Sequence, residues 1–405
     1  MNLDAVLRAE LHALEKSGLH RTLRAMDELP SGMLIFAAND YLGLSRHPAL
    51  IEAARQATAQ RGTGAGASRL VTGTNDAVLA LEEELAAWKE TDAALVFSSG
   101  YAAALGTIPA LVGKGDTVIL DKLAHASLID AARLSGATVR TFPHNDLGRL
   151  EKLLARISPG KTRVLVVTES IFSMDGDTAP LRELVELKER HGTWLLVDEA
   201  HATGLYGATG AGLIAEAGLS ARVEIVMGTL SKALGGVGGY IAGSRALIDW
   251  LINRARSFIY STALPPGVIA AGRTAVEVAR SPEGAALRNR LRENIAHFRE
   301  GLPMTWKNQA PSSSAIQPLI CGEASAALQL AAALREAGFL IPAIRYPTVP
   351  RHAARLRITL SAAHSEKEIN ALNKALATRP FCLNDLRPAA SKEGGRASIG
   401  VRSAW

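Results

Sequence analysis

Three apolar runs decide the fold: VLVVTES (164–170), WLLVDEA (194–200) and EIVMGT (224–229). Each run is apolar at nearly every position, which is typical of strands that are covered on both faces of a sheet. The stretches between the runs are long enough for helical crossovers, which join parallel strands. The sequence therefore predicts an α/β protein with a mainly parallel sheet and helices on both of its faces.

Further runs extend this arrangement in both directions along the chain. Additional strands of the large sheet are expected at 94–99, 117–121, 138–142 and 238–243. Around them the patterns predict a helix at about 3–17, a strand-like segment at 33–40, a helix at 244–256 and one long helix over most of 265–300. A smaller α/β region follows, with strands at 314–321, 339–345 and 356–360 and helices at 324–338 and 365–378. Ser365 with Glu368 three residues later is typical of a capping box at a helix start.

These elements predict four parts of the chain. They are an N-terminal helix and arm (1–45), a large domain around the parallel sheet (46–285), a small C-terminal α/β domain (286–382) and a tail (383–405). The tail is rich in Gly, Ser, Ala and Arg and has no periodicity, so we expect little intrinsic structure there.

Composition excludes several classes of protein. The 405 residues are 48% hydrophobic and 21% charged, and 45 Lys and Arg against 39 Asp and Glu give a net charge of +6 without a run of like charges. This balance does not favour a nucleic-acid partner. No apolar run reaches the ~18 residues that span a bilayer, and residues 1–18 lack the apolar centre of a secretory signal. Cys321 and Cys382 are far apart and the histidines lack metal-ligand spacing, so we expect no disulfide framework, no metal and a cytoplasmic location.

Polar side chains follow the ends of the three deciding strands. Ser173 follows the first run, Asp198 lies near the end of the second with His201 just after it, and Thr229 ends the third with Lys232 three residues later. In sheets of this kind, ligands bind at the carboxyl ends of the strands. The sequence therefore predicts a functional site at this edge.

Three interpretations of this edge compete. DEAH (198–201) matches a helicase string, but the G-x-x-x-x-G-K-[ST] loop that cradles nucleotide phosphates is absent from the sequence. GTGAGA (62–67), which could be mistaken for a dinucleotide-binding loop, also lacks the required spacing. The second interpretation is purely structural: Asp198 caps a turn and Lys232 is a solvated surface lysine. The third interpretation is a pyridoxal phosphate (PLP) site, where a lysine forms a Schiff base and a carboxylate pairs with the pyridine nitrogen. The succession of three such strand ends favours PLP.

Several motifs, in order along residues 15–380, resemble the α-oxoamine synthases. They are SSGYAA (98–103), HASLIDA (125–131), SIFSMDGD (170–177), LVDEAHATG (196–204), TLSKALGG (229–236) and FIYSTALPP (258–266). The resemblance implies the aspartate-aminotransferase-like fold (fold type I), PLP as cofactor, and condensation of an amino acid with an acyl thioester as carbon dioxide is lost.

Within the family, four motifs resemble the branch that serves biotin synthesis. They are NDYLGL (39–44), PHND (143–146), SAIQPLI (314–320) and AIRYPTVP (343–350). This likeness implies L-alanine and a pimeloyl thioester as substrates, the thioester being carried by coenzyme A or by acyl carrier protein. A glycine-using synthase of the same family and an aminotransferase of the same fold remain alternatives.

The resemblance also assigns roles to residues. Lys232 would bind the cofactor and then act as the base, Asp198 would hold the pyridine nitrogen, and His125 would stack on the ring. The remaining cofactor contacts would be Ser173 and His201 at the phenolic oxygen, Gly100, Tyr101 and Thr229 at the phosphate, and Tyr260, Ser261 and Thr262 from the second subunit of a homodimer with shared sites.

Five residues are implied on the substrate side, one of which is His125, which would help to orient the acyl carbonyl. Arg357 and Asn39 would bind the alanine carboxylate, and Thr348 would lie near the acyl chain. An arginine of the N-terminal arm would meet the thioester. His20, Arg21 and Arg24 all lie in the right stretch, and Arg21 is the preferred candidate.

Overall fold

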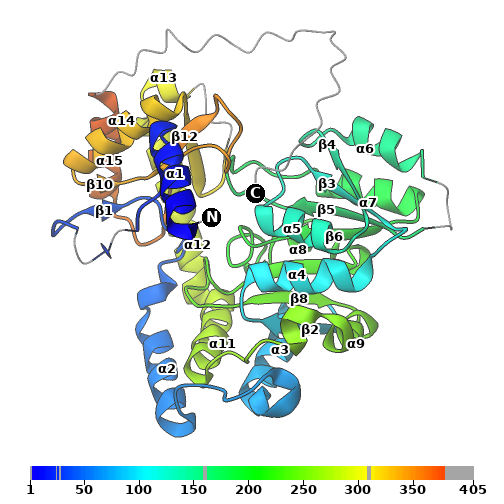
Figure 1. Cartoon of the computed structure of the whole chain (residues 1–405). Coiled ribbons are helices and arrows are strands. Elements are labelled where there is room, and N and C mark those ends of the chain that lie inside the picture. The colour runs from blue at the N-terminus through cyan, green and yellow to red at the C-terminus, as the bar shows by residue number, and fades with distance from the viewer. Residues whose placement is uncertain (1, 24, 27–28, 158–161, 308–311, 379–405) are drawn as a thin grey trace.

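The computed structural model describes residues 2–23, 25–26, 29–157, 162–307 and 312–378, and its central feature is a seven-stranded sheet (Figure 1). The strand order is β2-β8-β7-β6-β5-β3-β4. The strands are β2 (Ala93–Phe97), β3 (Thr117–Asp121), β4 (Thr138–Phe142), β5 (Val164–Glu169), β6 (Trp194–Asp198), β7 (Ile225–Thr229) and β8 (Gly239–Gly243). Strand β8 is antiparallel to β2 and β7, and the other neighbouring pairs are parallel. The prediction of a mainly parallel α/β sheet is confirmed.

Helices cover both faces of this sheet. One face packs against α4 (Gly100–Leu111), α5 (Ala126–Leu134), α9 (Arg245–Arg254) and α10 (Arg256–Ile259). The other face packs against α3 (Asp76–Trp88), α6 (Leu147–Leu154), α7 (Leu181–Arg190), α8 (Leu213–Glu216) and α11 (Pro266–Arg280). Successive residues of a strand point to opposite faces, so Leu165 belongs to one core and Val166 to the other. Burial on both faces is why these strands are continuously apolar.

A second sheet lies on the other side of the molecule (Figure 1). Its three antiparallel strands are β11 (Ala343–Ile344), β12 (Ala354–Thr359) and β9 (Ile316–Gly322), in that order. Helices α13 (Met304–Lys307), α14 (Ala324–Glu336) and α15 (Glu366–Ala377) belong to the same region of the chain. The capping box is confirmed, since the Ser365 side chain accepts from the Glu368 backbone and the Glu368 side chain accepts from the Ser365 backbone.

Three expectations about element boundaries were wrong. The long helix at 265–300 is two helices, α11 and α12 (Pro282–Gly301), because Ser281 adopts extended backbone before Pro282 and caps the second helix. The helix at 244–256 ends at Arg254, and α10 follows it. The strand at 339–345 is interrupted at Pro342. Its first half, β10 (Phe339–Leu340), pairs with β1 (Leu34–Ile35), and its second half, β11, pairs with β12.

The remaining elements frame the two sheets. They are α1 (Leu3–Lys16), α2 (Pro48–Arg61), the 3-10 turns η2 (Leu44–Arg46) and η4 (Ser220–Arg222), and a π-helical turn, η3 (Arg69–Gly73). In the described part of the chain, no helix is both long and apolar enough to cross a membrane, and no group of three or more His, Cys, Asp or Glu side chains is arranged to hold a metal ion. The expected tail at 383–405 lies outside the described residues.

Candidate active site

A cavity of about 190 Å³ brings together six of the residues that the sequence singled out, Asn39, His125, Ser173, His201, Lys232 and Arg357. It is lined by Ala37, Asn39, His125, Ser173, Met174, His201, Lys232, Pro342, Ile344 and Arg357. Its polar wall comes from the segments that follow β3, β5, β6 and β7, so it lies at the carboxyl edge of the main sheet, and β12 of the smaller sheet contributes Arg357. A larger groove of about 550 Å³ at the amino ends of β6 and β7 contains neither lysine nor histidine in its lining.

Lys232 is half-buried and sits in a turn that its neighbours fix. The Thr229 hydroxyl donates to the Gly238 carbonyl oxygen at 2.7 Å, and the Ser231 backbone N–H donates to the Thr229 hydroxyl at 3.1 Å. The Lys232 Nζ atom lies 3.0 Å from His201 Nε2. Desolvation lowers the pKa of the Lys232 amine, although the nearby carboxyl groups of Asp198 and Glu169 act in the opposite direction. The amine is therefore easier to deprotonate than that of a surface lysine.

Asp198 and Glu169 end adjacent parallel strands and are in register with each other. Both side chains are buried, with 5% and 2% of their surface exposed. Asp198 Oδ1 accepts from the Ala200 backbone N–H at 2.8 Å, so Asp198 does cap a turn. Its carboxyl group is also close enough to Lys232 and His125 to raise their pKa values against the effect of burial. Burial raises the pKa of Asp198, whereas Lys232 lowers it.

His201 joins Lys232 to a residue that the sequence analysis did not select, Tyr41. The Tyr41 hydroxyl lies 2.6 Å from His201 Nδ1. Burial holds the pKa of His201 well below its ordinary value, and the cations Lys232 and Arg357 act in the same direction. The imidazole is therefore neutral at pH 7. Its one ring hydrogen is either on Nδ1, which faces Tyr41, or on Nε2, which faces Lys232.

Arg357 is the buried cation of the cavity, with 7% of its surface exposed. Its Nε donates to the Ser173 carbonyl oxygen at 2.6 Å, and its Nη1 donates to Asn39 Oδ1 at 3.0 Å and to the Thr359 hydroxyl at 3.1 Å. Among the described residues no carboxylate forms an ion pair with it. A guanidinium that is held so firmly by neutral groups is suited to bind the carboxylate of a ligand.

The first turn of α4 lies next to Thr229. A Cβ atom added to Gly100 would lie 4.0 Å from the Thr229 hydroxyl oxygen, so these two candidate phosphate contacts adjoin. Strand β8 passes so close that a Cβ atom on Gly239 would stand 2.5 Å from the Gly100 nitrogen, which only glycine avoids. The N–H groups of a helix start favour an anion. The Tyr101 hydroxyl points elsewhere and donates to Asp130 at 2.7 Å.

Other sequence-selected residues lie outside this cavity. Arg21 is exposed, near Arg345, and Thr348 is exposed in the turn after it. His20 is half-buried and does not line the cavity, and Arg24 is outside the described residues. Tyr260 is 71% exposed, and Ser261 and Thr262 line a separate pocket under residues 69–75. One chain alone therefore does not bring these side chains to Lys232.

Two residues were missed. Tyr41 lies inside the quoted NDYLGL stretch, but a single aromatic side chain gave no sign that its hydroxyl meets His201. Glu169 is the last residue of β5, and an ionisable residue at the end of an otherwise apolar strand was the signal that could have identified it. The Glu169 Oε2 atom accepts from the Ser173 backbone N–H at 3.2 Å, while Oε1 is buried without a hydrogen-bond partner.

The donor set of this site fits pyridoxal phosphate. An amine with a lowered pKa, a buried carboxylate, two imidazoles and the start of a helix lie along one edge of the sheet. Lys232 can form the covalent bond to the cofactor aldehyde, and Asp198 can pair with a protonated pyridine nitrogen. The unpartnered Oε1 atom of Glu169 also indicates that this edge is built to meet a polar group.

Comparisons with known proteins show the family to which the chain belongs. The family profile described as aminotransferase class I and II matches residues 31–376. A relative from Geobacter sulfurreducens, an 8-amino-7-oxononanoate synthase, is 47% identical over 92% of this chain and 97% of its own, and one from Geobacter metallireducens is 49% identical over 89% and 94%.

Two solved structures are similar as well. Serine palmitoyltransferase from S. paucimobilis with bound PLP-myriocin aldimine has a TM-score of 0.86 at 30% identity and covers 93% of this chain and 98% of its own. The 8-amino-7-oxononanoate synthase of Francisella tularensis has a TM-score of 0.73 at 29% identity, covering 86% and 98%. Pyridoxal phosphate is the cofactor of this enzyme class, and the fold is that of its fold type I. The chain therefore belongs to the aminotransferase class I and II family and, within it, to the pyridoxal-phosphate-dependent α-oxoamine synthases that include the 8-amino-7-oxononanoate synthases.

Proposed function

We propose that this chain condenses L-alanine with a pimeloyl thioester to give 8-amino-7-oxononanoate, carbon dioxide and the free thiol in biotin synthesis. The observation that carries the proposal is the position of Arg357 in the same 190 Å³ cavity as Lys232 and His125. A buried guanidinium without an ion-pair partner favours a substrate with a carboxylate, and the amine and imidazole favour chemistry at the adjacent carbon. The names of the relatives supply the choice of amino acid and thioester.

The cofactor, when bound, supplies an electron sink for the bond that breaks at the amino-acid α-carbon. Lys232 would hold it, and its amine would then take the proton from that carbon. Asp198 would pair with the pyridine nitrogen, and His125 would cover the ring. Ser173 and neutral His201 would meet the phenolic oxygen. The backbone N–H groups of Gly100 and Tyr101 and the hydroxyl of Thr229 would meet the phosphate.

Arg357 and Asn39 position the amino acid by its carboxylate. Because Arg357 Nε is held by the Ser173 carbonyl oxygen at 2.6 Å, the guanidinium needs little reorganisation when the ligand arrives. Arg21 and Thr348 lie outside the cavity, and we assign them to the thioester side, where a long acyl chain and its carrier reach beyond the amino-acid pocket.

The phosphate contacts are completed by Tyr260, Ser261 and Thr262 from a second copy of the chain, so that the active form is a homodimer. The exposure of the Tyr260 side chain, 71%, supports this assignment because a phenol on the surface of one subunit is available to the other.

The decisive experiment supplies purified enzyme with pimeloyl thioester on coenzyme A or on acyl carrier protein, together with alanine, glycine or serine. Serine is included because similar structures are serine palmitoyltransferases. Thiol release and product mass are measured. We expect kcat/KM for alanine to exceed that for glycine by roughly tenfold to a hundredfold, since one hydrocarbon group in a fitting pocket is worth about 1–3 kcal/mol. A clear preference for glycine or serine would refute the substrate assignment.

A further inference from the structure

A continuous chain of hydrogen-bond contacts connects the two ends of the cavity through Tyr41. At one end Lys232 Nζ lies 3.0 Å from His201 Nε2, and the Tyr41 hydroxyl lies 2.6 Å from the other ring nitrogen. At the other end Arg357 Nη2 donates to the same phenolic oxygen at 3.4 Å. The amine and the guanidinium are thus joined by one imidazole and one phenol.

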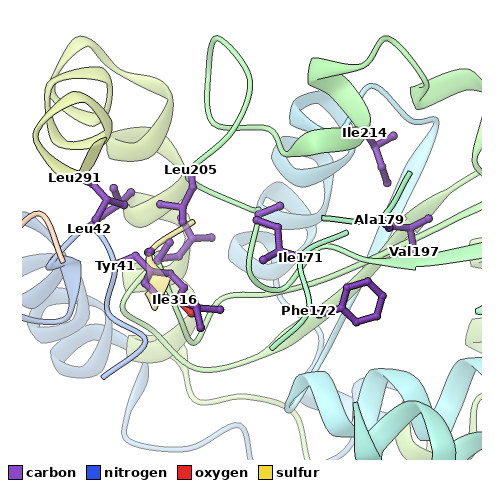
Figure 2. Packing of buried hydrophobic residues seen from close by; sticks show 14 of the residues in the cluster. Tyr41, Leu42, Ile171, Phe172, Ala179, Val197, Leu205, Ile214, Leu291 and Ile316 are labelled. Carbon is purple, nitrogen blue, oxygen red and sulfur yellow. The ribbon is translucent and has the colours of Figure 1, made fainter. Parts of the chain in front are cut away.

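Tyr41 is held rigidly in this position. Its side chain is 1% exposed and belongs to the main hydrophobic cluster, where it lies beside Ile316 (Figure 2). Burial raises the pKa of Tyr41, even though Arg357 lowers it, so the phenol keeps its hydrogen at physiological pH. Its hydroxyl therefore acts as a hydrogen-bond donor with one hydrogen to give.

Two atoms can accept the hydroxyl hydrogen of Tyr41: His201 Nδ1, at 2.6 Å, and Asn39 Oδ1, at 3.1 Å. The ring nitrogen is nearer and is the stronger acceptor, and the amide oxygen already accepts from Arg357 at 3.0 Å. Donation to Nδ1 requires the imidazole hydrogen to be on Nε2, where it faces Lys232.

We propose that Tyr41 is a positioning residue that fixes the tautomer of His201, so that His201 Nε2–H donates to the Lys232 nitrogen, and that links this pair to the carboxylate anchor Arg357. The inference rests on the proposed function, because it assigns a purpose to the site that Lys232 and Arg357 define. It adds a buried residue behind the lining of the cavity, which acts on Lys232 only through His201.

The consequence is a change in proton affinity at Lys232. A hydrogen bond donated to the Lys232 nitrogen favours its unprotonated form. Without the Tyr41 hydroxyl, the ring hydrogen of His201 can be on Nδ1, so that the lone pair of Nε2 faces the Lys232 nitrogen. This arrangement accepts a hydrogen bond from the protonated nitrogen and therefore favours its protonated form. The ionisable groups that face the Lys232–His201 pair are Asp198, Glu169, Arg357 and His125, and all of them remain in place when only the hydroxyl is removed.

The test replaces Tyr41 by Phe, which keeps the ring and removes the hydroxyl. The apparent pKa of the visible absorbance of the bound cofactor is measured by titration, and the alanine dissociation constant is measured from difference spectra. We expect the apparent pKa to rise by about one unit, which is a tenfold change in proton affinity, while alanine affinity changes less than about threefold. In a His201→Asn background, the same substitution should leave the apparent pKa unchanged.

Thr359→Val is the matched control, because Thr359 contacts the same guanidinium at 3.1 Å but not His201. It should weaken alanine binding without moving the apparent pKa. A second measurement does not depend on the cofactor. Nitrogen-15 NMR of the imidazole of His201, assigned with the His201→Asn variant, should show the hydrogen on Nε2 in the wild type and a loss of that preference in Tyr41→Phe.

Two outcomes would overturn the inference: an unchanged apparent pKa and tautomer in Tyr41→Phe, or an equal shift in the His201→Asn background. Failure of the proposed function is recognised separately, because wild-type protein would then show no visible absorbance from cofactor bound at Lys232, or no alanine-dependent spectral change.

Discussion

Glu169 and Asp198 stand side by side at the ends of β5 and β6, in register and almost completely buried. Two neighbouring carboxyl groups in a region of low polarity do not both ionise easily. Burial, followed by the charge of Asp198, raises the pKa of Glu169 well above its ordinary value. Burial also raises the pKa of Asp198, but the charges of Lys232 and His125 act against that rise. We therefore expect Glu169 to be the neutral acid of the pair and Asp198 to carry the charge.

The first prediction concerns Glu169→Gln, which imitates the neutral acid. Cofactor binding and turnover should stay within about threefold of the wild type, whereas Glu169→Ala, which removes the acceptor of the Ser173 N–H, should lose more. A carboxyl with a raised pKa in the folded state binds its proton more tightly than in the unfolded state. Wild-type stability should consequently fall as the pH rises above about 4.5.

The stability of Glu169→Gln should not fall in this way as the pH rises, because glutamine does not ionise. Its thermal midpoint should match the wild type near pH 5 and exceed it by roughly 2 °C or more at pH 8, as measured by scanning calorimetry with saturating cofactor. A Gln variant that is inactive, or whose midpoint differs from the wild type equally at both pH values, would show that Glu169 works as an anion.

The second prediction concerns Asp198→Asn. The substitution keeps the size of the side chain but removes the charge that would pair with the pyridine nitrogen, so the cofactor should still bind. Exchange of the alanine α-hydrogen in D2O, followed by proton NMR without any thioester, should slow at least about 100-fold, because a preorganised charge in such a site is worth several kcal/mol. Asp249→Asn, on the exposed face of α9, is the control. Exchange at the wild-type rate in Asp198→Asn would contradict the role.

The third prediction concerns sharing of the site between subunits. Lys232→Ala and the double variant Tyr260→Phe, Thr262→Ala should each be inactive or nearly so. If residues 260–262 serve the partner's site, each mixed dimer has one site with both lesions and one site with neither. Random exchange of equal amounts should therefore restore about a quarter of wild-type activity.

Mixing Lys232→Ala with Asp198→Asn is the matched control. These two residues line the same edge of one sheet, so every site of a mixed dimer keeps one lesion and no activity should return. If proven exchange restores nothing in the first mixture either, residues 260–262 act within their own subunit.

The sequence predicted the large sheet well because its central strands are buried on both faces, which leaves a nearly continuous apolar pattern in β5, β6 and β7. It failed where elements are short or interrupted. The two-residue strands β10 and β11 are defined by their partners in two different sheets, and nothing in the run 339–345 except Pro342 indicates the change. The break between α11 and α12 did have a local signal, Ser281 before Pro282, which the helical periodicity on either side obscured.

The site was predictable to the extent that its residues follow strand ends. Lys232, Asp198, His201 and Ser173 share one sheet edge, so topology alone predicts their proximity. Tyr41 approaches His201 from a segment 160 residues away, and only the packing of the N-terminal segment against the cavity places it there. An aromatic side chain is also typical of the hydrophobic core, and the ring of Tyr41 does lie in the core.

The last prediction concerns His144, which connects the end of β3 to the loop that carries Ser173. Its Nδ1 lies 3.1 Å from Asp121 Oδ1 and its Nε2 lies 2.7 Å from Asp177 Oδ2. Desolvation alone would lower the pKa of His144, but hydrogen bonds to the two carboxylates raise it to about 10. The side chain is therefore a cation at neutral pH, held between two anions.

A histidine whose pKa is raised by folding stabilises the protein fully below about pH 6.5, the ordinary value, and this contribution is lost as the pH rises towards 10. His144→Gln should accordingly lower the thermal midpoint by about 3 °C or more at pH 6, since hydrogen bonds between charged groups are worth about 2 kcal/mol. The deficit should shrink steadily up to pH 10. His12→Gln, at an exposed position of α1, is the control for replacing a histidine by glutamine. A deficit that is the same at pH 6 and pH 10 would mean that His144 packs as a neutral ring and that its charge does not hold the Ser173 loop in place.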